Sequence, residues 1–259
     1  MIKFAKMHGN GNDFVMVNSL EKEFNPKKAL IKKLGDRNLG IGFDQMIHIG
    51  APSKDNRDFA VKFYNTDGGK ANMCLNGVRC AATYVWDNKF APKRTLIFQT
   101  KKIDVECRPL KEGVEVILKN PTYFISKDLE KKLSKVIKTS FKLVDLGNLH
   151  LCLQKQSIDQ FDLNGLYKKL EALLRPLGIN LSIYSKDKDS YNIRTYENGV
   201  GETLSCGSAS FSVAYLCLKD EIKKTTIKSS GGSIKFTKLD DRILMSGPTK
   251  FVYSGSFHE

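Results

Sequence analysis

Two cysteines, Cys74 and Cys206, stand in segments of the chain that resemble each other. The first segment reads VKFYNTDGGKANMCLNGVRCAATYV, and the second, 132 residues later, reads NIRTYENGVGETLSCGSASFSVAYL. In each segment the cysteine precedes apolar residues at helical spacing. A duplicated fold that brings two equivalent thiols face to face has a chemical use. One thiolate can remove a proton from a carbon atom while the other thiol returns a proton to the opposite side.

The start of a helix suits this chemistry. The first backbone N–H groups of a helix lack partners and carry partial positive charge, which favours a thiolate and can also bind a carboxylate. Two such helix starts are predicted to hold the α-carboxylate of an amino acid and to flank its α-carbon with sulfur. The N–H donors would stabilise the charge that develops when the α-proton leaves. We therefore expect neither a cofactor such as pyridoxal phosphate nor a metal ion.

The duplication extends beyond the cysteine segments. A Gly-Asn pair ending at Asn12 precedes the first segment, and another ending at Asn148 precedes the second. Gln45 lies 33 residues after Asn12, and Asn180 lies 32 residues after Asn148. Two unrelated domains with coincident Asn-Gly turns would also give this pattern, but the ordered set of anchors favours duplication.

Short alternating stretches dominate the chain and predict strands. Helices are predicted over Pro26–Asp36, with Asn25 as the N-cap, over Leu163–Leu174, and after each of the two cysteines. The stretch 127–138 fits either a short helix or irregular structure. The expected strands are Ile2–Phe4, Phe14–Asn18, Gln45–Ile49, Phe59–Tyr64, Thr95–Thr100, Ile103–Arg108, Val114–Leu118, Lys142–Leu146, Leu149–Gln154, Ser182–Ser185, Tyr191–Tyr196, Thr225–Ser229, Ser233–Lys238 and Ile243–Ser246.

The predicted fold class is α/β (α+β), with two pseudo-symmetric strand-rich domains, each wrapped around a central helix that starts at its cysteine. The 259 residues suffice for two such cores. Pro121 suggests the boundary, so we expect one domain over residues 1–120 and the other over 121–247. The tail, residues 248–259, is predicted to return to the first domain.

Composition narrows the function classes. The net charge is +14, but the basic residues are mostly dispersed lysines and no nucleic-acid motif is present, so we expect no nucleic-acid partner. Apolar runs long enough for a membrane span are absent, and the N-terminal residues lack a signal-peptide pattern, which predicts a cytoplasmic protein without a membrane partner. The expected partner is a small-molecule amino acid, and a homodimer is left open.

Several motifs, in order along nearly the whole chain, carry a family resemblance. KMHGNGNDF, GIGFDQ, YNTDG, the Cys-Leu-Asn-Gly-x-Arg segment, GNLH and YENGVGET-x-x-CGS together resemble diaminopimelate epimerase and its relatives. The resemblance implies an isomerase whose active site lies between two pseudo-symmetric domains. It implies that Cys74 and Cys206 exchange protons with the substrate, with His150 and Glu197 as polar partners in the catalytic set. Substrate-binding positions implied by the resemblance are Asn12, Gln45, Asn65, Leu75, Asn76, Gly77, Asn148, Asn180, Asn198, Gly207 and Ser208.

Two of these positions depart from the family pattern. Leu75 stands where the family has glycine after the first cysteine, and Asn198 stands where the family has an arginine understood to pair with the distal carboxylate of diaminopimelate. Asparagine cannot supply the charge of a bidentate arginine. The preferred substrate is therefore expected to lack a distal carboxylate, and the fold family includes cofactor-independent histidine racemases. We predict a histidine racemase, with diaminopimelate epimerase as the alternative.

Other function classes fit less well. A binding protein that has lost catalysis would not need both cysteines. An isomerase of the phenazine-biosynthesis type lacks the cysteine pair. Cys80, Cys107, Cys152 and Cys217 are interpreted as small buried apolar residues.

Overall fold

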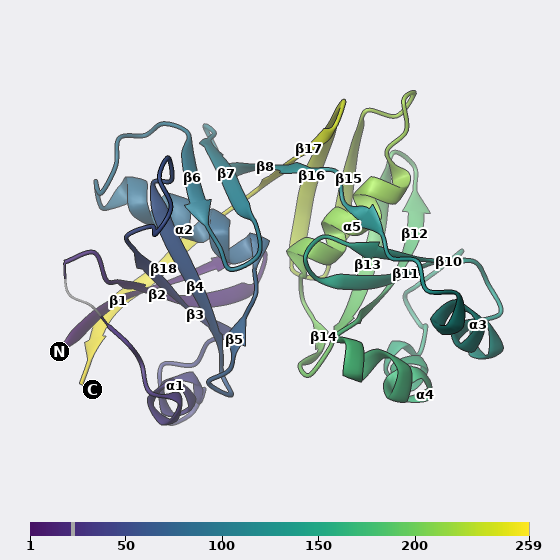
Figure 1. The fold of residues 1–259 in the computed structure, drawn as a ribbon, viewed down its shortest axis with the longest axis horizontal. Helices are drawn as coiled ribbons and strands as arrows, with labels where there is room; N and C mark the ends of the chain where they lie inside the picture. The colour runs from purple at the N-terminus through teal and green to yellow at the C-terminus, as the bar shows by residue number, and fades with distance from the viewer. Residues whose placement is uncertain (22–23, 259) are drawn as a thin grey trace. The chain divides into compact units, whose positions relative to one another are not determined.

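The computed structural model describes residues 1–21 and 24–258, which form two compact units (Figure 1). Unit 1 comprises Met1–Leu118 and Ser246–Glu259, and unit 2 comprises Lys119–Met245. The sequence-based boundaries lie at 120/121 and 247/248; residues 22, 23 and 259 of the predicted first domain lie outside the described residues.

Unit 1 is a strand-rich half around one long helix. Its hydrogen-bond pattern is a β1–β2 hairpin, a parallel β2–β3 pair, an antiparallel β3–β4 pair and a parallel β4–β6 pair. Helix α1 connects the first parallel pair and α2 the second, because parallel strands need a crossover. The elements are β1 (Ile2–Gly9), β2 (Asn12–Asn18), α1 (Lys28–Gly35), β3 (Gln45–Gly50), β4 (Phe59–Asn65), β5 (Lys70–Ala71), α2 (Leu75–Asp87), β6 (Leu96–Gln99), β7 (Asp104–Pro109), β8 (Val114–Lys119) and β18 (Lys250–Phe257).

Unit 2 repeats this order of elements and pairings. A β10–β11 hairpin is followed by a parallel β11–β12 pair, an antiparallel β12–β13 pair and a parallel β13–β15 pair. Helices α4 and α5 are the crossovers. The elements are β9 (Thr122–Tyr123), α3 (Lys127–Val136), β10 (Phe141–Asp145), β11 (Leu149–Gln154), α4 (Leu163–Leu174), the 3-10 turn η1 (Arg175–Leu177), β12 (Asn180–Asp187), β13 (Ser190–Glu197), β14 (Gly201–Thr203), α5 (Gly207–Cys217), β15 (Lys224–Ser229), β16 (Gly232–Leu239) and β17 (Arg242–Gly247).

Strand register makes the two units equivalent residue by residue. In unit 1, Phe14 pairs with Gln45; in unit 2, His150 pairs with Asn180. Since Phe14 and His150 each stand two residues after a Gly-Asn pair, the register reproduces the duplication seen in the sequence. Gln45 and Asn180 are therefore structurally equivalent positions.

The central helices are buried along most of their length. In α2, residues 75–82 are all buried, and in α5 residues 207–214 are all buried. The predicted apolar face of α2, which includes Val78 and Val85, is fully buried. The predicted fold class, two strand-rich halves around a central helix each, is confirmed.

The structure differs from one helix prediction and resolves another that was left open. Helix α1 begins at Lys28, with Lys27 as its N-cap and no side-chain cap, so the predicted start at Pro26 with Asn25 as N-cap is wrong. Lys27 has an extended backbone, with φ −68° and ψ 145°, and the buried Ile31 and Leu34 fix where the helix packs. The undecided stretch 127–138 contains α3, capped by Ser126.

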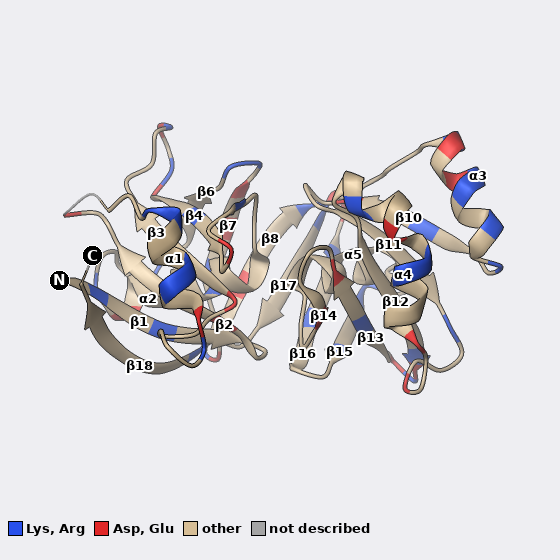
Figure 2. Ribbon diagram, turned by 90° about the horizontal axis from the view of Figure 1, so that it is seen from below, with Lys and Arg blue, Asp and Glu red and all other residues tan. Residues whose placement is uncertain are grey.

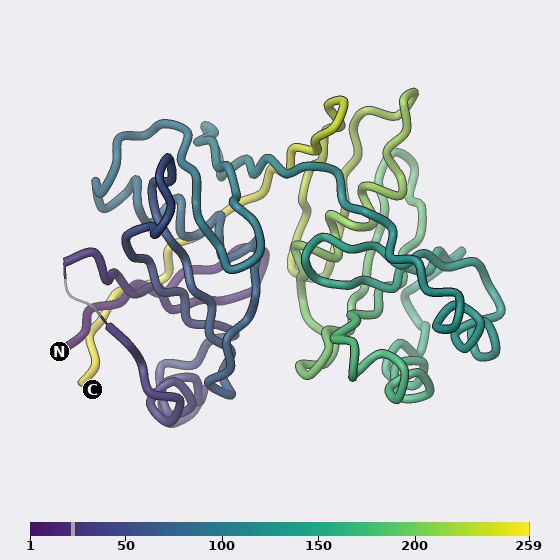
Figure 3. The backbone as a smooth tube through the Cα atoms, viewed as in Figure 1, coloured from purple at the N-terminus to yellow at the C-terminus, as the bar shows by residue number. Residues whose placement is uncertain are grey.

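The chain tail forms β18, antiparallel to β1, so the first and last strands of the chain lie side by side in unit 1 (Figure 3). Figure 2 shows lysines and arginines scattered over many elements rather than gathered on one. Among the described residues, no helix has the length and apolar character needed to cross a bilayer.

Candidate active site

Each cysteine occupies the N-cap of its unit's central helix. Cys74 precedes α2 and Cys206 precedes α5, both with extended backbone (φ −143°, ψ 110° and φ −115°, ψ 113°). Cys74 is half-buried and Cys206 is buried, and both are thiols outside any disulfide. The predicted placement of a thiol at the start of each repeated helix is thus present in the fold, where the first N–H groups and the helix dipole act on it.

Asn12 links the Cys74 sulfur to helix α2. The Cys74 Sγ donates to Asn12 Oδ1 at 3.6 Å, and Asn76 Nδ2 donates to the same oxygen at 3.4 Å. Asn76 is fully buried and is the second residue of α2. Two predicted site residues, Cys74 and Asn76, therefore donate to the side-chain oxygen of a third, Asn12.

Behind Asn12 lies a network of charged side chains. Asn12 Nδ2 donates to Asp44 Oδ2 at 2.8 Å, and Arg37 bonds both Asp44 and Asp13. Lys6 pairs with Asp13 at 2.6 Å and also contacts the Gly42 carbonyl. Burial opposes ionisation of Asp13, but hydrogen bonds from Arg37 and Lys6 lower its pKa to about 2.

Four residues of this network were not predicted as site residues: Lys6, Asp13, Arg37 and Asp44. A signal was present, because Asp13 follows Asn12 and Asp44 precedes Gln45 within the motifs GNDF and GFDQ.

Other predicted residues of unit 1 pack near the helix start. Gln45 Nε2 donates to Asn65 Oδ1 at 2.8 Å, between directly paired positions of β3 and β4. Leu75 is 1% exposed, so the side chain that replaces the family glycine is packed inside rather than lining an open pocket. Gly77 allows α2 to approach β3 closely, because an added Cβ would lie 2.5 Å from Ile47 Cδ1.

In unit 2 a hydroxyl bridges the cysteine to a histidine. Ser208 Oγ lies 3.5 Å from Cys206 Sγ and 3.0 Å from His150 Nε2. Gly207 and Ser208 form the first two residues of α5, both buried. His150 is fully buried on β11, and burial lowers its pKa to about 3, so the imidazole is neutral at pH 7.

The neutral imidazole lets the Ser208 hydroxyl work in two directions. With the proton on Nε2, His150 donates to Ser208, and Ser208 can donate to a Cys206 thiolate. With the proton on Nδ1, Ser208 donates to Nε2 and can accept from a Cys206 thiol. This arrangement can serve either protonation state of the sulfur.

The remaining predicted residues of unit 2 lie at strand ends and in the turns next to them. Glu197 Oε1 accepts a 2.6 Å hydrogen bond from Thr203, and Asn180 Oδ1 accepts one from the Asn198 backbone N–H at 2.9 Å. Asn148 is half-buried in the β10–β11 turn.

The Asn198 side chain has a structural partner. Its Nδ2 donates to the carbonyls of Leu174 and Arg175, at 3.2 and 3.3 Å, where α4 ends. The residue that stands in place of the family arginine thus caps a helix C-terminus, because its short side chain carries an amide NH₂ that can donate to the last carbonyls.

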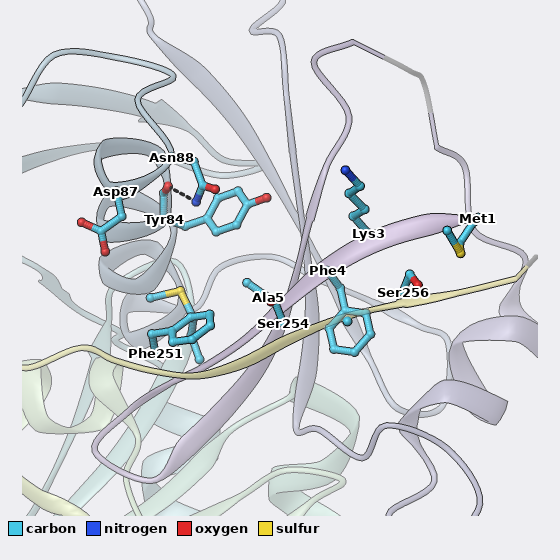
Figure 4. A pocket seen from close by; sticks show the side chains of 12 residues that line it. Met1, Lys3, Phe4, Ala5, Tyr84, Asp87, Asn88, Phe251, Ser254 and Ser256 are labelled. Carbon is cyan, nitrogen blue, oxygen red and sulfur yellow. Dashed lines mark hydrogen bonds between the residues drawn. The ribbon is translucent and has the colours of Figure 1, made fainter.

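Figure 4 shows a separate groove in unit 1, over β1, β18 and the C-terminal end of α2. Its lining includes Lys3, Tyr84, Asp87 and Phe251, but none of the predicted site residues. We assign no chemistry to this groove.

Comparisons with known proteins agree with the geometry. The family model described as diaminopimelate epimerase matches residues 4–122. A diaminopimelate epimerase of Wigglesworthia glossinidia brevipalpis is 33% identical, covering 99% of this chain and all of the relative. One from Pseudomonas entomophila (strain L48) is 30% identical, covering 98% of each.

The fold also matches a solved structure of a PhzF-family phenazine biosynthesis protein from Enterococcus faecalis. The TM-score is 0.69 at 15% identity, covering all of this chain and 99% of the other. At this identity the likeness shows the fold alone. The full-length relatives place the chain in the diaminopimelate epimerase family, as an isomerase of the amino-acid epimerase and racemase class.

Proposed function

We propose that the protein interconverts LL- and meso-diaminopimelate, with Cys74 and Cys206 as the two proton-transferring groups. The observation that carries the proposal is the matched position of the two thiols, each at the N-cap of an equivalent buried helix. Full-length relatives named diaminopimelate epimerase support this substrate. None of the three comparisons supports histidine as the substrate. We therefore replace the predicted histidine racemase with the alternative, a diaminopimelate epimerase.

In the proposed reaction one cysteine is a thiolate and the other a thiol. The thiolate takes the α-proton and becomes a thiol, and the electron pair of the broken C–H bond delocalises into the α-carboxylate. The other thiol then gives its proton to the opposite face of the α-carbon and becomes the thiolate. The product is the inverted epimer, and the two sulfurs have exchanged protonation states.

The helix starts would stabilise the intermediate. Backbone N–H groups of Asn76, Gly77, Gly207 and Ser208 lie in the first turns of α2 and α5, where they have no helical acceptor. Negative charge developing on the α-carboxylate would be stabilised by such fixed donors. The side chains of Asn12, Gln45, Asn65, Asn148, Asn180 and Glu197 would bind the rest of the amino acid.

The test is proton NMR of reduced enzyme in D₂O with LL-diaminopimelate and, separately, with L-histidine. The proposal expects loss of the α-proton signal of diaminopimelate together with appearance of the meso isomer. Exchange confined to histidine would contradict it. Exchange with neither substrate in the presence of fully reduced thiols would favour a protein that has lost catalysis.

A second measurement addresses the missing arginine. If a distal carboxylate is bound near position 198, Asn198→Arg should lower KM for diaminopimelate by about tenfold, because a bidentate charged pair is worth roughly 1.5–3 kcal/mol before the lost α4 cap is counted. Asn198→Gln is the matched control, since it lengthens the side chain without adding charge. An unchanged or raised KM in Asn198→Arg would mean that the distal carboxylate binds elsewhere.

A further inference from the structure

We propose that Arg37 and Asp44 are positioning residues that hold Asn12 with its carbonyl oxygen toward Cys74. The proposal deepens the function suggested for Cys74 and rests on it. It concerns two residues of unit 1 to which neither the sequence motifs nor the family resemblance had given a role.

The orientation of the Asn12 amide follows from its partners. An ionised carboxylate can only accept hydrogen bonds, so the group facing Asp44 Oδ2 at 2.8 Å must be the Asn12 NH₂. The Asn12 oxygen is then turned toward Cys74 Sγ and Asn76 Nδ2, both of which can donate. A carboxylate at position 44 therefore decides which end of the amide meets the sulfur.

Asp44 is itself held from several sides. Its Oδ1 accepts from Arg37 at 2.8 Å, and its backbone N–H donates to Asp13 Oδ1 at 2.9 Å. Asp13 is bound in turn by a bidentate Arg37 and by Lys6. The network ties strands β1 and β2 to the loop before β3, so Asp44 has little freedom to move.

The fold alone does not require these charges. In unit 2 the same hairpin and crossover place Leu149 after Asn148, where unit 1 has Asp13, and Ile179 before Asn180, where unit 1 has Asp44. Both units form the same parallel strand pair at this point. A purely structural role would not explain why only the unit with Asn12 against its cysteine carries the network.

Protonation of Asp44 would undo the arrangement, because a protonated carboxyl can donate and no longer dictates the amide orientation. Partial burial raises the pKa of Asp44 above its usual value, and Asp13 adds to this effect. The Asn12 and Asp13 hydrogen bonds and the charge of Arg37 oppose it. Lys6 acts on the network through Asp13, and Arg79 is the cation on α2 that interacts with Cys74.

Removing Arg37 should therefore move the titration of Asp44 to higher pH. Full-length protein labelled with ¹⁵N-asparagine reports this through the Asn12 side-chain NH₂ resonance, identified by its loss in Asn12→Ser. The expected midpoint shift in Arg37→Gln is upward by roughly half a unit to one unit, a small value because the arginine is largely exposed. Arg37→Lys should restore most of the wild-type midpoint.

Arg94→Gln is the matched control. Arg94 pairs with Asp58 at 2.7 Å in the same unit, and the two side chains are 55% and 19% exposed, close to 58% and 15% for Arg37 and Asp13. This variant should leave the Asn12 titration unchanged.

Kinetics supply the second readout. Arg37→Gln should lower kcat for epimerisation by about tenfold, with a smaller change in KM, because a misplaced proton-transfer partner affects the chemical step. An unchanged Asn12 midpoint in Arg37→Gln, or a kcat within twofold of Arg94→Gln, would overturn the proposal. The NMR titration needs no substrate, so it decides the positioning role even if the wild-type protein fails to epimerise diaminopimelate.

Discussion

The two units have the same order of elements and the same strand register, yet they surround their cysteines with different chemistry. In unit 1 the Cys74 sulfur meets an amide oxygen backed by ionised side chains. In unit 2 the Cys206 sulfur meets a hydroxyl backed by a neutral, buried imidazole. The shared scaffold supplies a helix start to each thiol, and the side chains that differ set how each thiol can exchange its proton.

The two surroundings favour different protonation states of the cysteines. Asn12 Oδ1 can only accept, so its contact favours a protonated Cys74, whereas Ser208 can donate or accept and serves either state of Cys206. Arg79, fully buried on α2, acts in the opposite sense on Cys74; burial lowers the pKa of Arg79, and the nearby thiols Cys80, Cys74 and Cys107 oppose that shift. In unit 1 the charge of Arg79 thus favours the thiolate form of Cys74, whereas the hydrogen bond to Asn12 favours its thiol form.

The largest expected effect tests whether the halves are equal partners. Cys74→Ser and Cys206→Ser should each lower epimerisation by roughly 1,000-fold or more, because hydroxyls at these positions are poor proton-transfer groups near pH 7. Each variant retains one thiol and should exchange the α-proton of only one epimer in D₂O, with opposite preferences in the two variants. Proton NMR with LL- and meso-diaminopimelate measures both effects.

Each cysteine variant has a control on its own helix. The controls are Cys80→Ala on α2 and Cys217→Ala on α5. Each removes a buried thiol whose pKa is raised by burial. These controls should keep wild-type kcat once any loss of stability is allowed for. Full turnover in either serine variant, or the same epimer preference in both, would break the equivalence of the halves.

The next effect in size concerns the residue that makes unit 2 different. His150→Phe installs the residue that unit 1 has at the equivalent position, Phe14. Since Ser208 would lose its partner, kcat should fall by roughly tenfold to a hundredfold. His48→Phe, which replaces another buried histidine, is the control and should retain activity. Equal kcat values for the two variants would remove the proposed role of the imidazole.

The same histidine predicts a pH dependence of stability. Its pKa is lowered from 6.5 to about 3 by burial, so the unfolded chain binds this proton at a higher pH than the folded chain does. The free energy of unfolding should therefore fall as the pH drops from about 6.5 toward 3, by up to ~1.4 kcal/mol per unit from this group. In urea titrations at several pH values, His150→Phe should show a flatter decline. A decline as steep as that of the wild type would assign the acid sensitivity to other groups.

The repeated elements could be predicted from the sequence because their signals are local. The helix after each cysteine has apolar residues at i, i+3 and i+4, and the strands alternate over four to eight residues, so periodicity alone identifies them. The equivalence of Cys74 and Cys206 followed from spacing, since duplication keeps the order of anchors. Ser208 was predicted as a binding residue through the family resemblance alone, and its bridge to His150 depends on how β11 lies against α5.

The ionic network of unit 1 could not be predicted in this way. Arg37 stands 24 residues from Asp13 along the chain, and their contact depends on the β2–β3 register and on the path of the loop after α1. The helix cap formed by Asn198 joins two elements that are likewise distant in sequence. The start of α1 was misplaced because an Asn-Pro pair fits a helix start by local preference, whereas packing of Ile31 and Leu34 decided the outcome.

The smallest expected effect compares the two crossover helices. The N-cap of helix α4 is Asp162, whose side chain accepts from the Gly165 N–H at 2.8 Å, whereas the N-cap of α1, Lys27, makes no side-chain cap. Asp162→Ala should lower the free energy of unfolding by about 1 kcal/mol. Lys27→Asp should raise it by a fraction of that amount, because the extended backbone at residue 27 is compatible with an N-cap and a carboxylate suits the helix dipole. Urea midpoints measure both changes, with Lys28→Ala as the control for simple loss of charge. If Lys27→Asp has no more effect than Lys28→Ala, the start of α1 is set by packing alone, and the two crossover helices are then stabilised by different means.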